Sequence, residues 1–171
     1  TRTIVNAFDD DAFALFELPS GLAGTRRRLT SDDVARWPVS LSPDGRFLLY
    51  VANDRRTGND VWVLPMSGTQ AAYPFQRTDA SENWATFSPD GRYVAFSSTE
   101  SGTAEVFVTP FPGPGPKWRV SRGTGTQTRW RQPGELLYLD GTRQLVAVSL
   151  RMTATAVEIV RTTTLFEITY P

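Results

Sequence analysis

The residue types that could carry out acid–base, nucleophilic or metal chemistry are scarce in this chain. It contains no histidine and no cysteine, and Lys117 is its only lysine. Ser–His and Cys–His nucleophile pairs, imidazole or thiolate metal ligands and disulfides therefore cannot form within these 171 residues. Carboxylate chemistry and chemistry assisted by the one lysine stay open. This shortage favours a binding module over an enzyme, and we predict no catalytic residue and no cofactor.

The densest group of carboxylates is the run Asp9–Asp10–Asp11. Three carboxylates could hold a hard cation such as Ca²⁺. The run falls, however, where we expect a hairpin between two strands, and neighbouring residues of a strand point to opposite faces of the sheet. We therefore interpret it as a solvated turn and predict no metal site.

The chain contains clusters of arginine, Arg26–Arg27–Arg28 and Arg55–Arg56, but acidic residues elsewhere balance their charge. Lys plus Arg and Asp plus Glu both number 18, so no net charge attracts the chain to nucleic acid. The apolar runs, of which 47–52 is typical, are only as long as a strand, so we expect no membrane insertion by this segment. Residues 1–3 show no signal-peptide pattern, so any targeting segment is expected outside the chain.

A repeat organises the sequence. Ser-Pro-Asp-Gly occurs at 42–45 and again 46 residues later at 88–91. A third copy at 132–135 has decayed to Gln-Pro-Gly-Glu. In such a turn proline presets φ, aspartate caps backbone N–H groups, and glycine takes the left-handed position. We therefore assign a structural turn role, rather than a catalytic one, to these residues: Ser42, Pro43, Asp44, Gly45, Ser88, Pro89, Asp90 and Gly91.

Each repeat of 43–48 residues has room for four short strands rich in aromatic and β-branched residues, and none shows a helical period. This pattern predicts an all-β chain, a β-propeller of four-stranded antiparallel blades. About 3.75 blades are expected over 1–171, with approximate bounds 1–30 (partial), 31–78, 79–121 and 122–171.

Strand counting predicts fifteen strands, because the first unit reads as the second, third and fourth strands of a blade. We weigh three outcomes. The favoured one is a partial propeller that pairs with further blades or associates with a second copy through open blade edges. The second is a four-bladed ring in which residues 168–170 supply the absent strand, and the third is an open arc.

The motifs SPDGRFLLY, FSPDGRYVAF and PFPGPGPKWRVS resemble the TolB-like, WD-repeat-like propellers. More narrowly, NDVWVLPMSG and the ending 164–167 resemble the C-terminal propeller of bacterial membrane-anchored serine/threonine protein kinases. The resemblance runs from about Leu29 to Glu167. It implies a periplasmic or extracytoplasmic sensor or protein-docking module. No kinase motif is present in the chain itself.

Two aromatic or proline-rich features have an ordinary structural interpretation. The tryptophans at 37, 84 and 130 recur at the blade starts, and we interpret them as packing between blades rather than as ligand-stacking residues. The segment 110–116 is interpreted as a stiff connection between third and fourth strands rather than as a docking peptide.

Propeller ligands usually meet the face formed by loops that join fourth to first strands and second to third strands. Polar residues of mixed charge on those loops suit protein or peptide recognition. The predicted binding residues are Asp32, Asp33, Arg36, Arg55, Arg56, Asp79, Glu82, Asn83, Gln127 and Arg129.

The function predicted from these residues is a non-catalytic protein- or ligand-binding sensor propeller, part of a bacterial kinase. The alternative is the substrate-gating propeller of a prolyl-oligopeptidase-like serine peptidase, whose Gly-x-Ser-x-Gly motif and histidine would lie outside this chain. A carboxylate-based glycosidase is a weaker third option, because it needs convergent acidic pairs.

Overall fold

The computed structural model describes residues 3–9, 12–19, 24–30, 34–68, 70–113, 115–153 and 155–169. These residues form fifteen strands in four antiparallel sheets, which confirms the all-β propeller prediction. Asp10, Asp11, Asp32 and Asp33 lie outside the described residues, so the predictions made for them are not tested.

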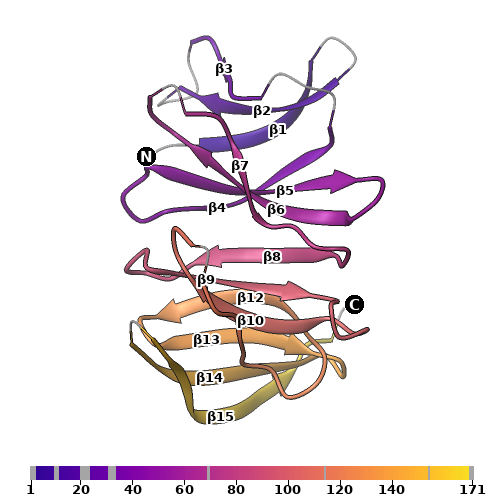
Figure 1. Ribbon diagram of the computed structural model, residues 1–171, viewed down its shortest axis with the longest axis vertical. Helices are drawn as coiled ribbons and strands as arrows, with labels where there is room; N and C mark the ends of the chain where they lie inside the picture. Colours follow the sequence, from indigo (N-terminus) through magenta and orange to yellow (C-terminus); the bar gives the residue numbers. More distant parts are fainter. Residues whose placement is uncertain are drawn as a thin grey trace.

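Each sheet is built from consecutive strands (Figure 1). The first contains β1 (Thr3–Asp9), β2 (Ala12–Leu18) and β3 (Arg27–Arg28). The second contains β4 (Arg36–Leu41), β5 (Phe47–Asp54), β6 (Gly58–Pro65) and β7 (Tyr73–Gln76). The third contains β8 (Glu82–Phe87), β9 (Tyr93–Ser98), β10 (Glu105–Pro110) and β11 (Trp118–Arg119). The fourth contains β12 (Gly125–Gln132), β13 (Glu135–Asp140), β14 (Gln144–Met152) and β15 (Val157–Glu167).

The strand order explains why the sheets behave as propeller blades. In the second, third and fourth sheets the first strand lies at one edge and the fourth strand at the opposite edge. The first strands β4, β8 and β12 contact one another from sheet to sheet, so these edges converge at the inner side of the array. The fourth strands form the outer side.

The core consists of three layers, each between two neighbouring sheets. Leu15 of the first sheet packs with Leu48 of the second, and Val63 of the second packs with Phe87 of the third. Leu136 of the fourth sheet is completely buried against the third. Burying such a leucine side chain contributes roughly 1.5–3 kcal/mol. Successive side chains of a strand point to opposite faces of its sheet, and each face packs on a neighbouring sheet. The inner sheets are therefore buried on both faces.

The Ser-Pro-Asp-Gly turns repeat their hydrogen bonds closely. The Gly45 N–H donates to the Ser42 carbonyl and the Ser42 hydroxyl donates to Asp44, at 2.8 and 2.6 Å. The equivalent bonds of Gly91 and Ser88 have the same lengths, 2.8 and 2.6 Å. Both glycines have positive φ, +69° and +71°, a conformation in which other residues are strained. In the fourth sheet the decayed turn is a two-residue connection between Gln132 and Glu135.

The second alternative, a closed four-bladed ring, is wrong. Figure 1 shows the first and last sheets at opposite ends of a stack, so the four sheets form an open arc. The Ile168 N–H donates to the Arg143 carbonyl at 2.9 Å, so the tail continues beside its own sheet and does not complete the first. The backbone N–H and C=O groups of β15 form their hydrogen bonds within the long β14–β15 hairpin. Pairing of the arc with further blades or with a second copy stays a prediction.

Candidate functional site

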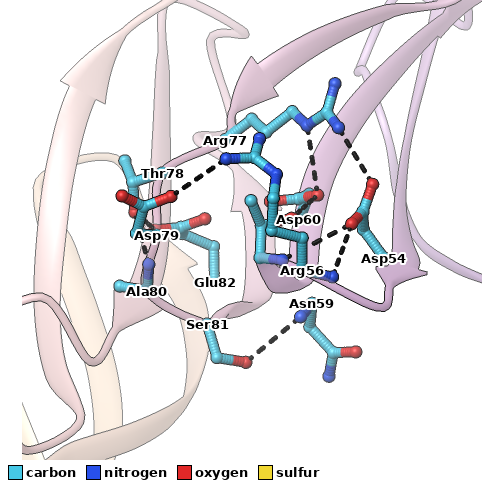
Figure 2. Close-up of polar contacts among 11 residues, drawn as sticks. Asp54, Arg56, Asn59, Asp60, Arg77, Thr78, Asp79, Ala80, Ser81 and Glu82 are labelled. Atoms are coloured by element: carbon cyan, nitrogen blue, oxygen red, sulfur yellow. Dashed lines mark hydrogen bonds and ion pairs between the residues drawn. The ribbon is translucent and has the colours of Figure 1, made fainter.

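Two neighbouring loops on the face that the sequence indicates carry a group of connected polar contacts. They are the β5–β6 hairpin and the β7–β8 connection, shown together in Figure 2. Asp54 fixes the hairpin because its Oδ1 accepts the backbone N–H of Arg56 at 2.8 Å. Its Oδ2 accepts from Arg77 Nη2 at 2.9 Å. The backbone hydrogen bond from Arg56, followed by that from Thr57 and the charge of Arg77, lowers the pKa of Asp54.

Two carboxylates beneath these loops are buried. Asp60 is 1% exposed; its Oδ2 accepts from the Thr57 hydroxyl at 2.7 Å and lies 3.5 Å from Arg77 Nε. Glu82 is 0% exposed, and its Oε1 accepts from Thr78 at 2.6 Å and from Ser98 at 3.2 Å. Burial raises the pKa of both carboxyl groups, and each also carries a contribution from a second acid, Asp54 for Asp60 and Asp60 for Glu82.

These buried acids are held by hydroxyl groups of the surrounding residues. One oxygen of each, Oδ1 of Asp60 and Oε2 of Glu82, has no hydrogen-bond partner among the described residues, yet neither atom reaches the surface. Through their other oxygens, Asp60 and Glu82 hold Thr57, Thr78 and Ser98 in place. Among the described residues no group of three or more acidic or other ligating side chains is placed to hold a metal.

A polar seam connects the second sheet to the third across the same face. We define it as Asn53, Asn59, Ser81 and Asn83. Asn59 Nδ2 donates to Asn83 Oδ1 at 2.8 Å, and Asn53 Nδ2 donates to Asn59 Oδ1 at 2.8 Å. Asn83 Nδ2 completes the seam by donating to the Ser81 hydroxyl at 3.1 Å. The seam fixes the relative position of the two blades, so loops of different blades are held in one arrangement.

A cleft of about 1060 Å³ lies between the first and second sheets and reaches this face. Its floor contains the partly exposed Trp62, whose ring stacks at a centroid distance of 6.3 Å on that of Tyr50, a residue only 2% exposed. Leu29, Val34 and Leu64 add apolar surface. Volumes of 300–1,000 Å³ are typical of ligand pockets, so the cleft has the size to hold a small molecule or a short stretch of peptide.

The charges that line the cleft are unequal. Three arginines face two aspartates, and both aspartates, Asp54 and Asp60, already form ion pairs with Arg77. Arg36 is buried and lies over the Tyr50 ring at 5.7 Å, where it stiffens the floor. Arg55 is exposed at the margin of the cleft. The cleft therefore combines an aromatic floor with the exposed guanidinium of Arg55 at its margin.

The structure brings together several of the predicted binding residues. Arg36 and Arg55 line the cleft, and Arg56 and Asp79 form an exposed ion pair at 3.5 Å. Asn83 belongs to the polar seam. Gln127 and Arg129 lie one blade further on, in β12.

The assignment of several of these residues to loops is wrong. Arg36, Glu82, Asn83, Gln127 and Arg129 lie within first strands, because β4, β8 and β12 begin earlier than their turn signals indicate. Glu82 and Arg36 are also buried, so neither is an exposed contact residue. Backbone pairing with the second strand extends these strands through polar residues that composition alone assigns to loops.

Sequence reasoning missed the cleft floor and the Asp60–Arg77 pair. One signal was available: an acid stands at or near the start of the third strand in both complete repeats, Asp60 and Glu105, 45 residues apart. Each pairs with an arginine from the fourth-strand side of its own blade, Arg77 and Arg119 respectively. Tyr50 and Trp62 carried no comparable signal, because they alternate like any other buried strand residues.

Comparison with known proteins supports the fold class. No model of a known protein family matches the chain. It is 33% identical over 100 residues, 57% of its length, to tricorn protease homolog 1 of Streptomyces coelicolor. It is 30% identical over 131 residues, 75% of its length, to tricorn protease homolog 2 of the same organism. The chain spans only 9% and 10% of these relatives.

Solved structures agree at the level of fold. A TolB protein from Agrobacterium tumefaciens superimposes with a TM-score of 0.70 at 16% identity, over 94% of this chain and 61% of that one. TolB from Acinetobacter baumannii gives 0.68 at 20% identity, over 97% and 42%. A puromycin-hydrolysing peptidase from Mycobacterium tuberculosis gives 0.61 at 14% identity, over 88% and 24%. The chain therefore has the fold of a TolB-like β-propeller.

Proposed function

We propose that this chain is a non-catalytic recognition module that binds a protein or peptide segment at the cleft between its first two blades. The observation that carries the proposal is the cleft itself, with the Trp62 ring, packed on buried Tyr50, on its floor and Arg55 at its margin. Aromatic side chains and arginine are the residues that contribute most at binding sites, because they offer large rigid contacts and several hydrogen-bond donors.

The charge of the cleft specifies the kind of segment. Since Arg77 compensates Asp54 and Asp60, the ligand should carry a carboxylate for Arg55 and an apolar side chain for the floor. An acidic residue next to a leucine or phenylalanine meets both requirements.

For the parent protein we propose the extracytoplasmic part of a bacterial serine/threonine kinase. The support is the resemblance of residues 29–167 to such propellers. A kinase domain and a membrane-spanning helix encoded next to this segment would support it, and a hydrolase domain there would contradict it. Within the described ranges, no helix has the length and hydropathy to cross a membrane.

A second candidate is the substrate-gating propeller of a serine peptidase. The comparisons favour it, since two relatives are named as tricorn protease homologues and one similar structure is a peptidase. In this case the same cleft would select peptide segments for a hydrolase domain elsewhere in the polypeptide. The two candidates share peptide recognition and differ in what is attached to the propeller.

The test of peptide recognition is selection from a random peptide library displayed on phage, with the purified chain as the target. We expect enrichment of sequences that place Asp or Glu beside Leu or Phe. Binding of an enriched peptide should fall at least about tenfold in Arg55→Ala, because the charge-assisted contact is lost. Arg161→Ala in β15, at the far end of the stack, is the control and should bind normally. Failure to enrich, or equal loss in both variants, would overturn the proposal.

A further inference from the structure

The first sheet has no strand at the position that forms the inner edge of the other three sheets. In those sheets the inner edge is a first strand, β4, β8 or β12. β1 and β2 contact β4 in the way that β5 and β6 contact β8, which identifies β1 as a second strand. The pair Leu-Pro, at 18–19 and again at 64–65, agrees, because it stands where β2 and β6 end. No strand of the described residues pairs with the inner edge of β1.

The burial of β1 shows the consequence. The second strand of the third sheet, β9, is buried over its whole length. In β1, by contrast, Asn6 is exposed and Phe8 is 59% exposed. The Phe8 ring lies edge-on to that of Phe13 in β2, which is 46% exposed, at a centroid distance of 4.8 Å. Because phenylalanine is usually buried, an exposed pair beside an open strand edge indicates a surface that another element covers.

The backbone groups of Ile4, Asn6 and Phe8 point to this open edge. In the second sheet the N–H of Asn53 donates to the first strand, to the Ala35 carbonyl at 3.2 Å. Phe8 has the same place in its sheet, because Phe8 and Asn53 each pair with the second residue of the next strand. The hydrogen-bonding groups of alternate residues point to the same edge of a strand. β1 therefore offers one side of an antiparallel ladder.

The complete sheets show what covers such an edge. In each of them a first strand pairs antiparallel with the second strand, and one large apolar residue of the first strand packs in the core. These residues are Leu41, Phe87 and Trp130, and their register partners are Leu48, Val94 and Leu136. The corresponding residue of β1 is Thr3, because Thr3 and Leu48 each pair with the leucine near the end of the third strand. A strand added to β1 would place a large apolar residue opposite Thr3.

The tryptophans of the first strands are not buried alike. Trp130 packs on the core between the third and fourth sheets, as expected. Trp37 and Trp84 are 44% and 41% exposed, so the expectation that they pack between blades is wrong. Trp84 lies at a register shift of β8, and the hydroxyl of the buried Thr128 in the next blade donates to its carbonyl. A first strand can therefore carry a large ring that its own blade leaves partly uncovered.

A ring at the position of Trp37 would have a partner in a strand added to β1. Trp37 pairs with Val51, and the residue of β1 that corresponds to Val51 is Asn6. Asn6 and Phe8 are two residues apart, so their side chains share one face of the sheet. A ring opposite Asn6 would therefore lie diagonally beside Phe8, within reach of an aromatic contact.

The charge at one end of the edge indicates the direction and the kind of segment. β1 ends at Asp9, and Asp10 and Asp11 follow in the sequence. An antiparallel strand would have its N-terminal end beside these acids, where a basic residue meets opposite charge. In the second sheet the equivalent end of β4 begins with Arg36.

We propose that the open edge of β1 binds an extended segment of a partner protein as the fourth strand of the first sheet. The segment has a basic residue next to an aromatic one and a large apolar residue four positions later, the spacing of Trp37 and Leu41. A second copy suits the edge less well, because each of its first strands already pairs with its own second strand. The edge is separate from the cleft, since no residue that lines the cleft belongs to β1 or β2. Either surface can therefore fail without the other.

The test is calorimetric titration of the chain with a blocked peptide that has the sequence of residues 34–42, VARWPVSLS. We expect saturable binding that weakens at least about tenfold in Phe8→Ala, because the aromatic contact is lost. Phe166→Ala in β15, where the ring is 58% exposed, is the matched control and should bind normally. The cleft variant Arg55→Ala should also bind normally. A peptide with Arg36→Glu should bind several-fold more weakly.

Methylation of single backbone nitrogens of the peptide tests the pairing itself. In β4 the Ser42 N–H donates to the Phe47 carbonyl of β5, so by alternation the Ser40 N–H points to β5 and the Leu41 N–H points away. A methyl group on the Ser40 nitrogen of the peptide should abolish binding, and one on the Leu41 nitrogen should leave it unchanged.

Four outcomes would overturn this proposal. They are the absence of saturable binding, equal affinity of Phe8→Ala and the parent, and equal effects of the two methyl groups. The fourth is a parent chain that sediments as a dimer and becomes monomeric in Phe8→Ala, which would assign the edge to a second copy.

Discussion

The two ends of each blade follow different rules. At one end the turns between first and second strands repeat almost atom for atom, so that Phe47 N–H to Ser42 Oγ is 2.9 Å and Tyr93 N–H to Ser88 Oγ is 3.0 Å. At the opposite end the second-to-third hairpins differ. One uses Asp54, and the next uses Ser98, whose hydroxyl accepts the Glu100 N–H at 3.2 Å.

This difference separates scaffold from recognition. A hydrogen-bond pattern that repeats in successive blades is explained by what every blade needs in order to fold. Contacts that occur in a single blade, such as the Arg56–Asp79 pair and the cleft, are not explained in that way. Loops on a rigid scaffold are where binding residues concentrate. The comparison predicts that changes at the turn end alter stability alone, and that exposed changes at the loop end alter binding.

The largest effect should come from Arg77→Met. Removing the guanidinium leaves Asp60 buried without its ion pair and frees Asp54. We expect the free energy of unfolding to fall by roughly 2–4 kcal/mol, measured by urea denaturation. Arg119→Met, which removes the partner of Glu105 in the next blade, is the matched variant. If only one of the two variants lost stability, the buried acid–arginine pair would not be an element that the two blades share.

A smaller loss is expected from the turn end. Ser42→Ala and Ser88→Ala each remove a hydroxyl that accepts a backbone N–H and donates to an aspartate. Each should lower the free energy of unfolding by about 1–2 kcal/mol, and by similar amounts because the geometry is the same. Clearly unequal losses by urea denaturation would break the equivalence of the two turns.

Glu82→Gln should stabilise the chain near neutral pH. Burial raises the pKa of Glu82 in the folded state, so the ionised carboxylate destabilises the fold. That penalty is absent below the unfolded pKa of about 4.3 and grows as the pH rises through the higher folded pKa. The melting temperatures of the variant and the parent should therefore agree at low pH and diverge above it. A variant that melts lower than the parent at pH 7 would contradict this.

The smallest effect is expected from Arg56→Ala. Both partners of the Arg56–Asp79 pair are largely exposed, with side chains 73% and 91% accessible. Solvent screens such pairs, and the free energy of unfolding should change by less than about 0.5 kcal/mol. The melting temperatures of the variant and the parent should therefore agree in thermal melts at low salt and again at high salt. A larger change would mean that the loop end contributes to the scaffold.

The fold could be predicted because its cause is local and repeated. Proline and glycine at fixed places in a turn, with alternation on either side, specify a hairpin wherever they occur. The count of fifteen strands and the partial first sheet followed from that period alone. The choice between a partial propeller, a closed ring and an open arc could not be made from the sequence, because ring closure depends on angles between sheets that no single repeat encodes.

The site was only partly predictable. Arg55, Arg56 and Asp79 lie on the loops where the sequence placed them, because loop length and polarity indicated those connections. The cleft floor was missed because Trp62 alternates as core residues do, and its partial exposure depends on how two sheets separate. The exposure of Trp84 depends on a backbone bulge held by a residue 44 positions away, which no local pattern reveals.

The separation of scaffold from recognition is tested most directly with two variants, Ser88→Ala and Arg55→Ala. For each variant, the affinity for one library-selected peptide and the free energy of unfolding are measured. We predict that Ser88→Ala loses stability and keeps its affinity, whereas Arg55→Ala loses affinity and keeps its stability. If affinity and stability fell together in both variants, the two ends of the blade would form one cooperative unit, and the account would be wrong.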